Sequence, residues 1–175
     1  METKISVLLS QEEVENRILD MAKQINQDYQ GKQIHLIGIL KGSVFIVCEL
    51  AKHITVPVTM DFMSVSSYGD GTESSGRVKI AKDLDEGIEG KEVLVVEDII
   101  DSGRTLTYLM KVLMARNPAS LKLCTLLDKP DRRVPEADVT VDYVGFAIPD
   151  KFVVGYGLDY AQKYRNLPYI GVVEE

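Results

Sequence analysis

The residues from Val93 to Leu113 constrain the fold more than any other part of the chain. Four consecutive apolar residues, Val93 to Val96, indicate a strand that is buried on both faces of a parallel sheet. The acids Glu97 and Asp98 follow at the point where such a strand should end. A short turn then leads into apolar residues at helical spacing, namely Leu106, Leu109, Met110, Val112 and Leu113. This order of strand, turn and helix predicts an α/β domain with a mainly parallel sheet.

The turn between this strand and this helix, Asp101 to Thr105, has the composition of a phosphate-binding site. A helix that begins near Arg104 leaves its first backbone N–H groups unpaired, at the positive end of the helix dipole. Gly103 lets the backbone approach an anion, and the hydroxyls of Ser102 and Thr105 add donors. Alternatively, the turn supplies only a helix cap, and the two acids are ordinary polar residues at a strand end. The stretch matches neither GxxxxGKS/T nor GxGxxG, which argues against a P-loop and a dinucleotide-binding fold.

The whole chain has the size and composition of one globular domain. Its 175 residues suffice for a full core but not for two large domains, and 45% of them are hydrophobic and 27% charged. We therefore expect a single domain, residues 1–175. No apolar stretch reaches about 18 residues, so no membrane span is expected. A net charge of −7 argues against broad electrostatic binding to nucleic acid or to an anionic membrane.

The two cysteines indicate the redox compartment. Cys48 and Cys124 lie in apolar surroundings, with neither CxxC spacing nor a nearby His cluster. The pattern predicts buried, reduced thiols rather than a disulfide or a zinc site. The N-terminus has no signal-peptide pattern, and the cytoplasm is the expected compartment.

Periodicity predicts the remaining elements. A capping box at Ser10 and Glu13, followed by apolar residues at helical spacing, predicts a helix from Ser10 to about Tyr29. A second helix is expected to begin at Val44. His35 alternates within its strand and is predicted to be structural. Further strands are expected at Ile34–Ile39, Val56–Val65, Val78–Ala81, Leu121–Leu127 and Val139–Ala147.

Three polar segments stand next to these predicted strands. Lys41 precedes a Gly turn after a buried strand and could hold an anion, although such a lysine is usually a solvated surface charge. Residues 66–77 are rich in Gly and Ser, and a loop of this length in a compact domain is either disordered or a functional lid. Asp131 to Arg133, after a later strand, are interpreted as a solvated turn.

Two stretches of the chain resemble the motifs of a known enzyme family. VVEDIIDSGRT, residues 95–105, resembles the phosphoribosyl-pyrophosphate (PRPP) signature of type I phosphoribosyltransferases. KFVVGYGLDYAQKYR, residues 151–165, resembles the purine-binding hood of the hypoxanthine–guanine branch of that family. The resemblance implies a mainly parallel, twisted sheet flanked by helices, with ligands at the carboxyl ends of the strands. It also implies a lid at about 66–77 and a small hood formed mainly by residues 147–175.

The resemblance further implies a reaction. In it, the 5-phosphoribosyl group of PRPP passes to N9 of hypoxanthine or guanine, which gives IMP or GMP and pyrophosphate in purine salvage. Mg²⁺ is the implied cofactor, and a homodimer or homotetramer is the implied assembly. Two alternatives stay open from the residues alone. One is a regulator on the same fold that senses PRPP or a nucleotide and binds RNA or DNA, and the other is a transferase that prefers xanthine or guanine.

For the PRPP side of the site, the resemblance assigns roles to the acid-rich turn. Glu97 and Asp98 would bind the ribose hydroxyls, directly or through the metal. Asp101 would act as the base at purine N7. The 5′-phosphate would be held by the loop Asp101, Ser102, Gly103, Arg104 and Thr105.

For the purine side, the resemblance assigns Lys129 to the exocyclic O6, Phe152 to stacking on the base and Val153 to the edge of the base. Asp159 would lie beside the purine and would help Glu97 and Asp98 to hold Mg²⁺.

For the leaving group, the resemblance assigns Lys41, Gly42 and Arg165 to pyrophosphate, next to a Leu40–Lys41 peptide bond that can be cis. Ser67 and Tyr68 occupy the Ser-Tyr positions of the family's lid.

Overall fold

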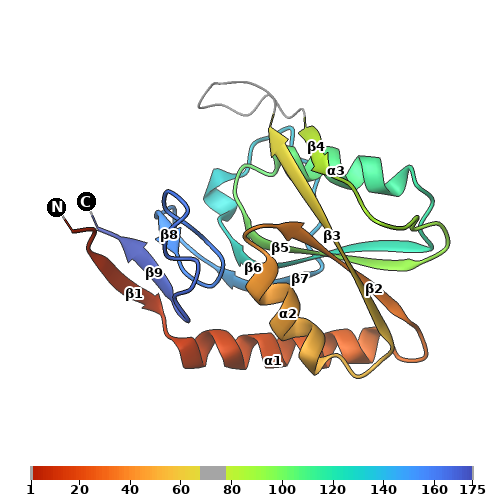
Figure 1. The fold of residues 1–175 in the computed structure, drawn as a ribbon, viewed down its shortest axis with the longest axis horizontal. Helices are drawn as coiled ribbons and strands as arrows, with labels where there is room; N and C mark the ends of the chain where they lie inside the picture. The colour runs from red at the N-terminus through yellow and green to blue at the C-terminus, as the bar shows by residue number, and fades with distance from the viewer. Residues whose placement is uncertain (1, 68–77, 175) are drawn as a thin grey trace.

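A computed structural model of the chain describes residues 2–67 and 78–174 (Figure 1). In this part of the chain, six strands form one sheet in the order β4-β3-β2-β5-β6-β7. Every neighbouring pair is parallel except β3 with β4, so the expected mainly parallel sheet is confirmed. The strands are β2 (Ile34–Leu40), β3 (Val58–Ser67), β4 (Val78–Lys82), β5 (Glu92–Ile100), β6 (Ser120–Asp128) and β7 (Tyr143–Ala147).

Helices cover both faces of this sheet. Helices α1 (Gln11–Asp28) and α2 (Val44–His53) pack on one face, and α3 (Arg104–Met114) packs on the other (Figure 1). Side chains alternate along each strand, so Leu94 and Val96 face α1 and α2, whereas Val93 and Val95 face α3. Because helices cover both faces of the sheet, these consecutive side chains of β5 are buried, and this explains why they are all apolar.

The capping box predicted for α1 is present. The Ser10 hydroxyl accepts the N–H of Glu13 at 3.1 Å, and the Glu13 carboxylate accepts the N–H of Ser10 at 3.3 Å.

The prediction that both cysteines are buried holds for one of them. Cys124 in β6 is buried, and burial raises the pKa of its thiol to about 12. Cys48 is exposed on the outer face of α2, so its predicted burial is wrong. The residues of α2 are apolar on several sides of the helix, so its sequence does not indicate which side faces the core.

Two strands begin later than the sequence predicts. Strand β3 begins at Val58, after Pro57, which has no N–H to donate to the ladder. Strand β7 begins at Tyr143 rather than at Val139. Val139 and Val141 lie in an irregular segment before β7. Their side chains pack against the core cluster to which α3 contributes. Their apolar character reflects burial, which a strand would also require.

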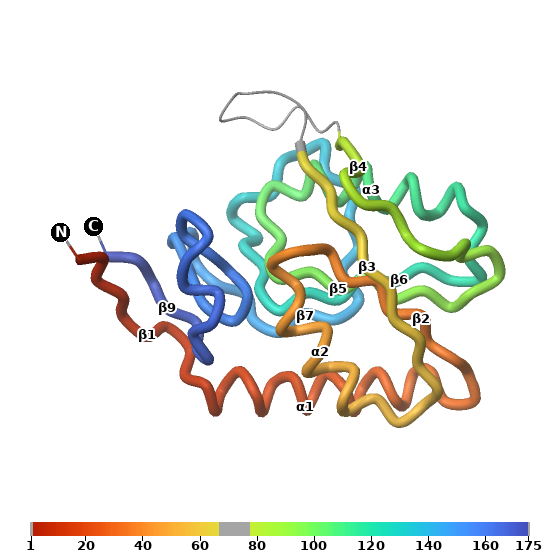
Figure 2. The backbone as a smooth tube through the Cα atoms, in the orientation of Figure 1, coloured from red at the N-terminus to blue at the C-terminus, as the bar shows by residue number. Residues whose placement is uncertain are grey.

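A separate antiparallel sheet, with the order β1-β9-β8, lies at one end of the molecule (Figures 1 and 2). It consists of β1 (Ile5–Leu9), β8 (Val153–Val154) and β9 (Ile170–Val173). Ile5 lies opposite Val173, so the two ends of the described chain meet in this sheet. The hood therefore contains an N-terminal strand in addition to the predicted C-terminal residues.

The predicted lid lies between β3 and β4. Ser67 is the last residue of β3 and pairs with Val78 of β4. Tyr68 and the residues up to Arg77 lie outside the described residues. The lid roles of Ser67 and Tyr68 thus stay predictions.

Within the described part of the chain, none of the helices has the length and apolar character needed to cross a membrane.

Candidate active site

The carboxyl ends of the parallel strands define the candidate site. Strands β2, β5, β6 and β7 end at Leu40, Ile100, Asp128 and Ala147. Because neighbouring strands are parallel, the segments that follow them meet at one edge of the sheet, where α/β proteins bind ligands. The predicted residues for PRPP, for the purine and for pyrophosphate come from the last residues of these strands, from the segments that follow them and from the hood.

Gly42 lies at the centre of this edge, between an acid of β5 and a loop of the hood. A Cβ atom added to Gly42 would come within 1.8 Å of Asp98 Oδ2. A Cβ atom added to Gly157 would come within 2.0 Å of the carbonyl oxygen of Gly42. The backbone after β2 therefore touches both β5 and the hood, and the close approach depends on glycine on each side. The Leu40–Lys41 peptide bond that precedes Gly42 is cis.

Glu97 and Asp98 lie within β5, which continues to Ile100 instead of ending before the two acids. Both side chains are half-buried. Burial raises the pKa of Glu97 well above its ordinary value, and the neighbouring Asp98 raises it further. Burial also raises the pKa of Asp98, although the N–H of Ile99 donates to its Oδ1 at 2.7 Å and nearby Arg165 opposes the shift. Two adjacent carboxyl groups in this setting favour a bound cation or a shared proton.

The turn that begins α3 has the geometry of an anion site. Gly103 adopts a φ of +82° directly before the helix, where it supplies no side-chain cap. The N–H and the hydroxyl of Thr107 both donate to the carbonyl oxygen of Gly103, at 2.9 and 2.7 Å. The Ser102 hydroxyl accepts the N–H of Arg104 at 3.4 Å. The turn thus presents the start of a helix, where backbone N–H groups and the helix dipole favour phosphate. Thr105 lies in the first turn of this helix.

Two arginines after β6 bind the turn after β5. The Nε atom of Arg132 donates to Asp101 Oδ1 at 3.0 Å, and Arg133 donates to the Asp101 carbonyl oxygen at 3.0 Å. Arg133 also donates to Asp128 at 2.6 Å. The interpretation of Asp131 to Arg133 as a merely solvated turn is therefore wrong for both arginines. Because β5 and β6 are adjacent and parallel, the residues that follow them meet, a proximity that is invisible in the sequence.

Lys129 is buried at the end of β6, with 7% of its surface exposed. Its N–H donates to the carbonyl oxygen of Ile100 at 3.0 Å, which ties it to the end of β5. Its Nζ lies 3.7 Å from Asp150 Oδ1, and Asp150 Oδ2 lies 3.7 Å from Arg132 Nη1. Asp150 thereby links the predicted purine residue to Arg132 and, through it, to Asp101. Asp150 is not among the residues predicted from the sequence, although an acid soon after a parallel strand is the same signal that indicates Glu97 and Asp98.

The hood supplies an exposed aromatic pair. The ring of Phe152 is half exposed and meets Tyr160 edge to face, with ring centroids 5.5 Å apart. Both line a cavity of about 760 Å³ together with Asp150. Val153 is buried in β8, opposite Val172 of β9. An exposed ring beside a cavity can stack on a planar base, as predicted for Phe152.

The predicted pyrophosphate residues come together from two separate segments. The side chains of Lys41 and Arg165 both donate to the amide oxygen of Gln162, at 3.3 and 3.1 Å. Arg165 also lies 3.4 Å from Asp159 and donates to the Gly157 carbonyl oxygen at 2.6 Å. Lys41 and Arg165 are thus neighbours, although they are far apart in the sequence.

The residues present fit a magnesium ion that takes most of its ligands from a substrate. Across residues 2–67 and 78–174, no three His, Cys, Asp or Glu side chains form a ready-made metal cluster. Glu97 and Asp98 offer adjacent carboxylates whose mutual repulsion a cation would relieve. Mg²⁺ suits such a pair, because it retains water and accepts phosphate oxygens. Asp159 already accepts the N–H of Gln162 at 2.8 Å, and its role as a third ligand stays a prediction.

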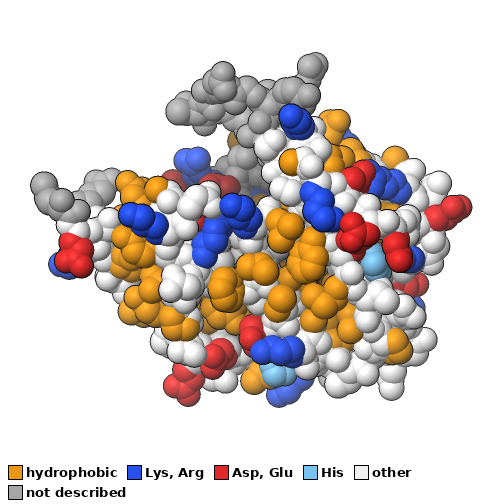
Figure 3. Space-filling model, in the orientation of Figure 1, with side chains coloured by type: hydrophobic (Ala, Val, Ile, Leu, Met, Phe, Trp, Pro, Cys, Tyr) orange, Lys and Arg blue, Asp and Glu red, His pale blue; other side chains and the backbone are white. Residues whose placement is uncertain are grey.

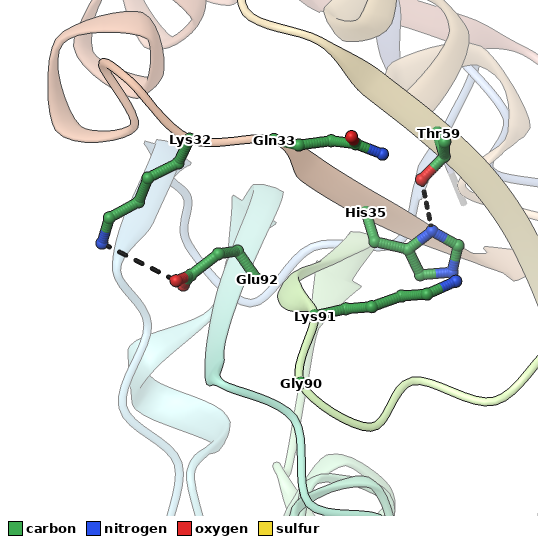
Figure 4. A pocket seen from close by; sticks show the side chains of 7 residues that line it. All are labelled: Lys32, Gln33, His35, Thr59, Gly90, Lys91 and Glu92. Atoms are coloured by element: carbon green, nitrogen blue, oxygen red, sulfur yellow. Dashed lines mark hydrogen bonds and ion pairs between the residues drawn. The ribbon is translucent and has the colours of Figure 1, made fainter.

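A second cavity, of about 370 Å³, lies at the opposite edge of the sheet, where β2, β3 and β5 begin (Figure 4). Its lysines are paired with acids, Lys32 with Glu92 at 3.8 Å and Lys91 with Glu86 at 3.4 Å. The Nδ1 atom of His35 shares a hydrogen bond of 2.7 Å with the Thr59 hydroxyl. His35 is buried far from the strand ends that define the site, in agreement with its predicted structural role. The lining residues are Lys32, Gln33, His35, Thr59, Gly90, Lys91 and Glu92.

We predict that His35 makes the stability of the protein depend on pH. Burial, and after it the charge of Lys91, lower the pKa of His35 below 6.5, while Asp61 and Glu86 oppose the shift less strongly. The unfolded chain therefore binds the proton more tightly than the folded protein does. The free energy of unfolding should be maximal above about pH 6.5 and should fall as the pH decreases below that value. Urea denaturation at several pH values between about 5 and 8 measures this slope.

His35→Gln should reduce the decrease in stability between about pH 7 and pH 5. The exposed His53 provides the matched control, since His53→Gln should leave the slope unchanged. An unaltered slope in His35→Gln would assign the pH dependence to other groups.

Comparison with known proteins identifies the family. The family model for the phosphoribosyl transferase domain matches residues 5–161. The hypoxanthine-guanine phosphoribosyltransferase of Bacillus subtilis is 52% identical over 168 residues, which cover 96% of this chain and 92% of that protein. The hypoxanthine phosphoribosyltransferase of Salmonella typhimurium is 51% identical over 175 residues, with 99% and 97% covered. A crystal structure of a hypoxanthine phosphoribosyltransferase from Staphylococcus aureus superposes with a TM-score of 0.93 at 50% identity, and covers 97% of this chain and 91% of that one. The chain belongs to the phosphoribosyl transferase domain family.

Proposed function

We propose that this protein transfers the 5-phosphoribosyl group of PRPP to N9 of a 6-oxopurine, hypoxanthine or guanine, in purine salvage. The products are IMP or GMP and pyrophosphate. The observation that carries this proposal is the position of Gly42, which touches Asp98 on one side and Gly157 of the hood on the other. The segments predicted to hold PRPP, pyrophosphate and the purine are therefore parts of a single site. The names and the high identity of the relatives support the same reaction.

The charges of the site suit the bond that breaks. Cleavage of the C1–O bond of PRPP develops positive charge on the ribose and negative charge on pyrophosphate. Glu97 and Asp98 would lie beside the ribose, and Lys41 and Arg165 would face the leaving group. Glu97 and Asp98 would also hold Mg²⁺, which when bound neutralises part of the charge of pyrophosphate. The backbone and hydroxyls from Ser102 to Thr105 would hold the 5′-phosphate at the start of α3.

Asp101 and Lys129 would act on the purine from opposite ends of one ionic chain. Asp101 would take the proton at purine N7 while N9 attacks C1 of the ribose. The ammonium of Lys129 would donate to the exocyclic O6. Phe152 would stack on the base, and backbone groups of Val153 would meet its edge. In the free protein, Arg132 and Asp150 connect the two charged residues.

A panel of bases tests this function directly. Purified protein is incubated with PRPP, Mg²⁺ and either hypoxanthine, guanine, xanthine or adenine, and nucleotide products are separated by chromatography. We expect IMP and GMP, and no AMP, because the amino group of adenine cannot accept the hydrogen bond of Lys129. A dominant XMP product would favour the xanthine-preferring alternative. If none of the four bases gives a nucleotide product, the proposal is wrong.

We predict that Lys129→Ala lowers kcat/KM for hypoxanthine by about 10²-fold, because a buried charged donor to O6 is lost. Initial rates at varied hypoxanthine and saturating PRPP measure the effect. Lys111→Ala, which removes an exposed lysine of α3, serves as the control and should change kcat/KM by less than about twofold. If Lys129→Ala uses hypoxanthine as well as the wild type does, the assignment of Lys129 to the purine O6 is wrong.

We also propose a homodimer or homotetramer. Figure 3 shows hydrophobic side chains gathered on the face that carries α2 and β3. Phe45 of α2 and Met60 of β3 are exposed apolar residues, with 39% and 41% of their surfaces accessible. Apolar surface of this kind favours association. Sedimentation velocity at several protein concentrations would give the assembly, and a monomer throughout would contradict the proposal.

A further inference from the structure

Gln162 occupies the space between the two cations assigned to pyrophosphate. Its Oε1 atom accepts hydrogen bonds from Lys41 Nζ at 3.3 Å and from Arg165 Nη2 at 3.1 Å. Lys41 belongs to the loop after β2, whereas Arg165 belongs to the hood. One neutral amide oxygen therefore joins the charged ends of two side chains from separate parts of the fold.

The backbone of Gln162 is held in a tight turn. Tyr160 and Lys163 exchange two backbone hydrogen bonds of 3.0 Å, and the two residues between them, Ala161 and Gln162, have φ values of +51° and +67°. Two-residue turns with positive φ at both positions favour Asn and Gly, which are absent here. The N–H of Gln162 also donates to Asp159 Oδ2 at 2.8 Å. A strained conformation fixed by these bonds aims the Gln162 side chain at the two cations.

The two cations differ in how firmly they are held. Arg165 donates to the Gly157 carbonyl oxygen at 2.6 Å and lies 3.4 Å from Asp159 Oδ1, so the hood fixes its guanidinium. Lys41 is exposed, and its ammonium stands on a flexible four-carbon stem. The hydrogen bond to Gln162 is therefore the contact that brings Lys41 beside the anchored Arg165.

We propose that Gln162 is a positioning residue, which holds Lys41 next to Arg165 so that both cations are in place when the pyrophosphate group of PRPP binds. This inference rests on the proposed function. A neutral amide oxygen gathers the cations without neutralising them. The charged oxygens of pyrophosphate form stronger bonds with both cations and can displace the amide. A carboxylate at the same place would remain paired with the cations and would compete with the substrate.

Three substitutions separate positioning from a role in the turn. Gln162→Ala removes the amide, and pyrophosphate should bind about tenfold more weakly. Gln162→Glu keeps the length and adds a negative charge, and the loss should be larger, about 10²-fold. Gln162→Asn suits the positive φ but is one methylene shorter, so it should resemble Gln162→Ala. For a residue that serves only the turn, Asn would instead be neutral or stabilising, and Ala and Glu would behave alike.

The primary measurement is the dissociation constant of inorganic pyrophosphate in the presence of Mg²⁺, obtained by isothermal titration calorimetry. The KM for PRPP should rise in parallel, while kcat at saturating PRPP should change by less than about threefold, because the amide is not part of the chemical step. Thermal unfolding of each variant verifies that it is folded. In a Lys41→Ala background, Gln162→Ala should have almost no further effect, because the residue that it positions is gone.

The outcomes distinguish this inference from the proposed function. If the wild-type protein forms IMP but the Gln162 variants retain pyrophosphate affinity within about twofold, the positioning role is wrong and the function remains. Additive effects of Lys41→Ala and Gln162→Ala would also contradict it. If the wild-type protein forms no nucleotide, the proposed function fails, and the role of Gln162 fails with it.

Discussion

Replacement of Asp101 by Asn is expected to lower kcat for phosphoribosyl transfer by about 10²- to 10⁴-fold, with PRPP affinity within about threefold of the wild type. The amide has nearly the shape of the carboxylate but cannot take a proton from purine N7. The surrounding backbone should persist, because Arg133 holds the carbonyl oxygen of residue 101 rather than its side chain. Binding of PRPP would therefore be retained while the acceptor is no longer activated.

Rapid-quench measurement of a single turnover tests this expectation, because it separates chemistry from product release. Asp131→Asn is the control, since Asp131 is an exposed acid in the short helix after β6 and belongs to none of the proposed subsites. It should leave kcat within about twofold of the wild type. An unchanged single-turnover rate in Asp101→Asn would remove Asp101 as the base. A loss confined to PRPP affinity would assign it to binding of the donor.

Gly157→Ala is expected to lower kcat/KM by at least about 10²-fold and the free energy of unfolding by about 2–4 kcal/mol. Gly157 has a φ of +102°, and a Cβ atom there would lie 2.0 Å from the backbone oxygen of Gly42. A backbone atom cannot move aside as the end of a flexible side chain can. The hood or the loop after β2 must therefore shift, and Gly42 already lies against Asp98. A displacement at this contact would change the proposed pyrophosphate and ribose subsites together.

The chain offers a matched control for this substitution. Gly87 is exposed, and a Cβ atom at that position would meet no other atom within 4 Å. Gly87→Ala should change the free energy of unfolding by less than about 0.5 kcal/mol and leave kcat/KM unaltered. Urea denaturation and steady-state kinetics measure both quantities. Normal kinetics in Gly157→Ala would show that the contact between the hood and Gly42 is not required for activity.

The sequence predicts the parts of the fold whose causes are local. The passage from β5 through Gly103 into α3 follows from an apolar run, a glycine turn and helical spacing within a few residues. The capping box of α1 is equally local. Strand β1 is different, because its only partner in the described chain is β9, at the other end of the sequence. Its five residues carry too little periodicity to identify a strand by themselves.

The candidate site also has parts that the sequence predicts and parts that it does not. Its motifs predict the acids of β5, the proposed phosphate turn and the hood, because each motif is a short continuous stretch. The contacts between these stretches are tertiary and have no signature in any of them. The approach of Gly42 to Asp98, and the chain of ionic contacts from Lys129 through Asp150 and Arg132, arise only when parallel strands end side by side.

The pairing of β1 with β9 has a consequence for synthesis on the ribosome. Strand β1 is made before the six-stranded sheet, and its partner β9 is made after it. The core sheet can form while the chain is still growing, but β1 has to wait unpaired until β9 emerges. The proposed purine-binding half of the site, which includes the hood, is therefore completed after the sheet. A nascent chain can assemble the proposed phosphate turn before it has the proposed place for the base that receives the sugar.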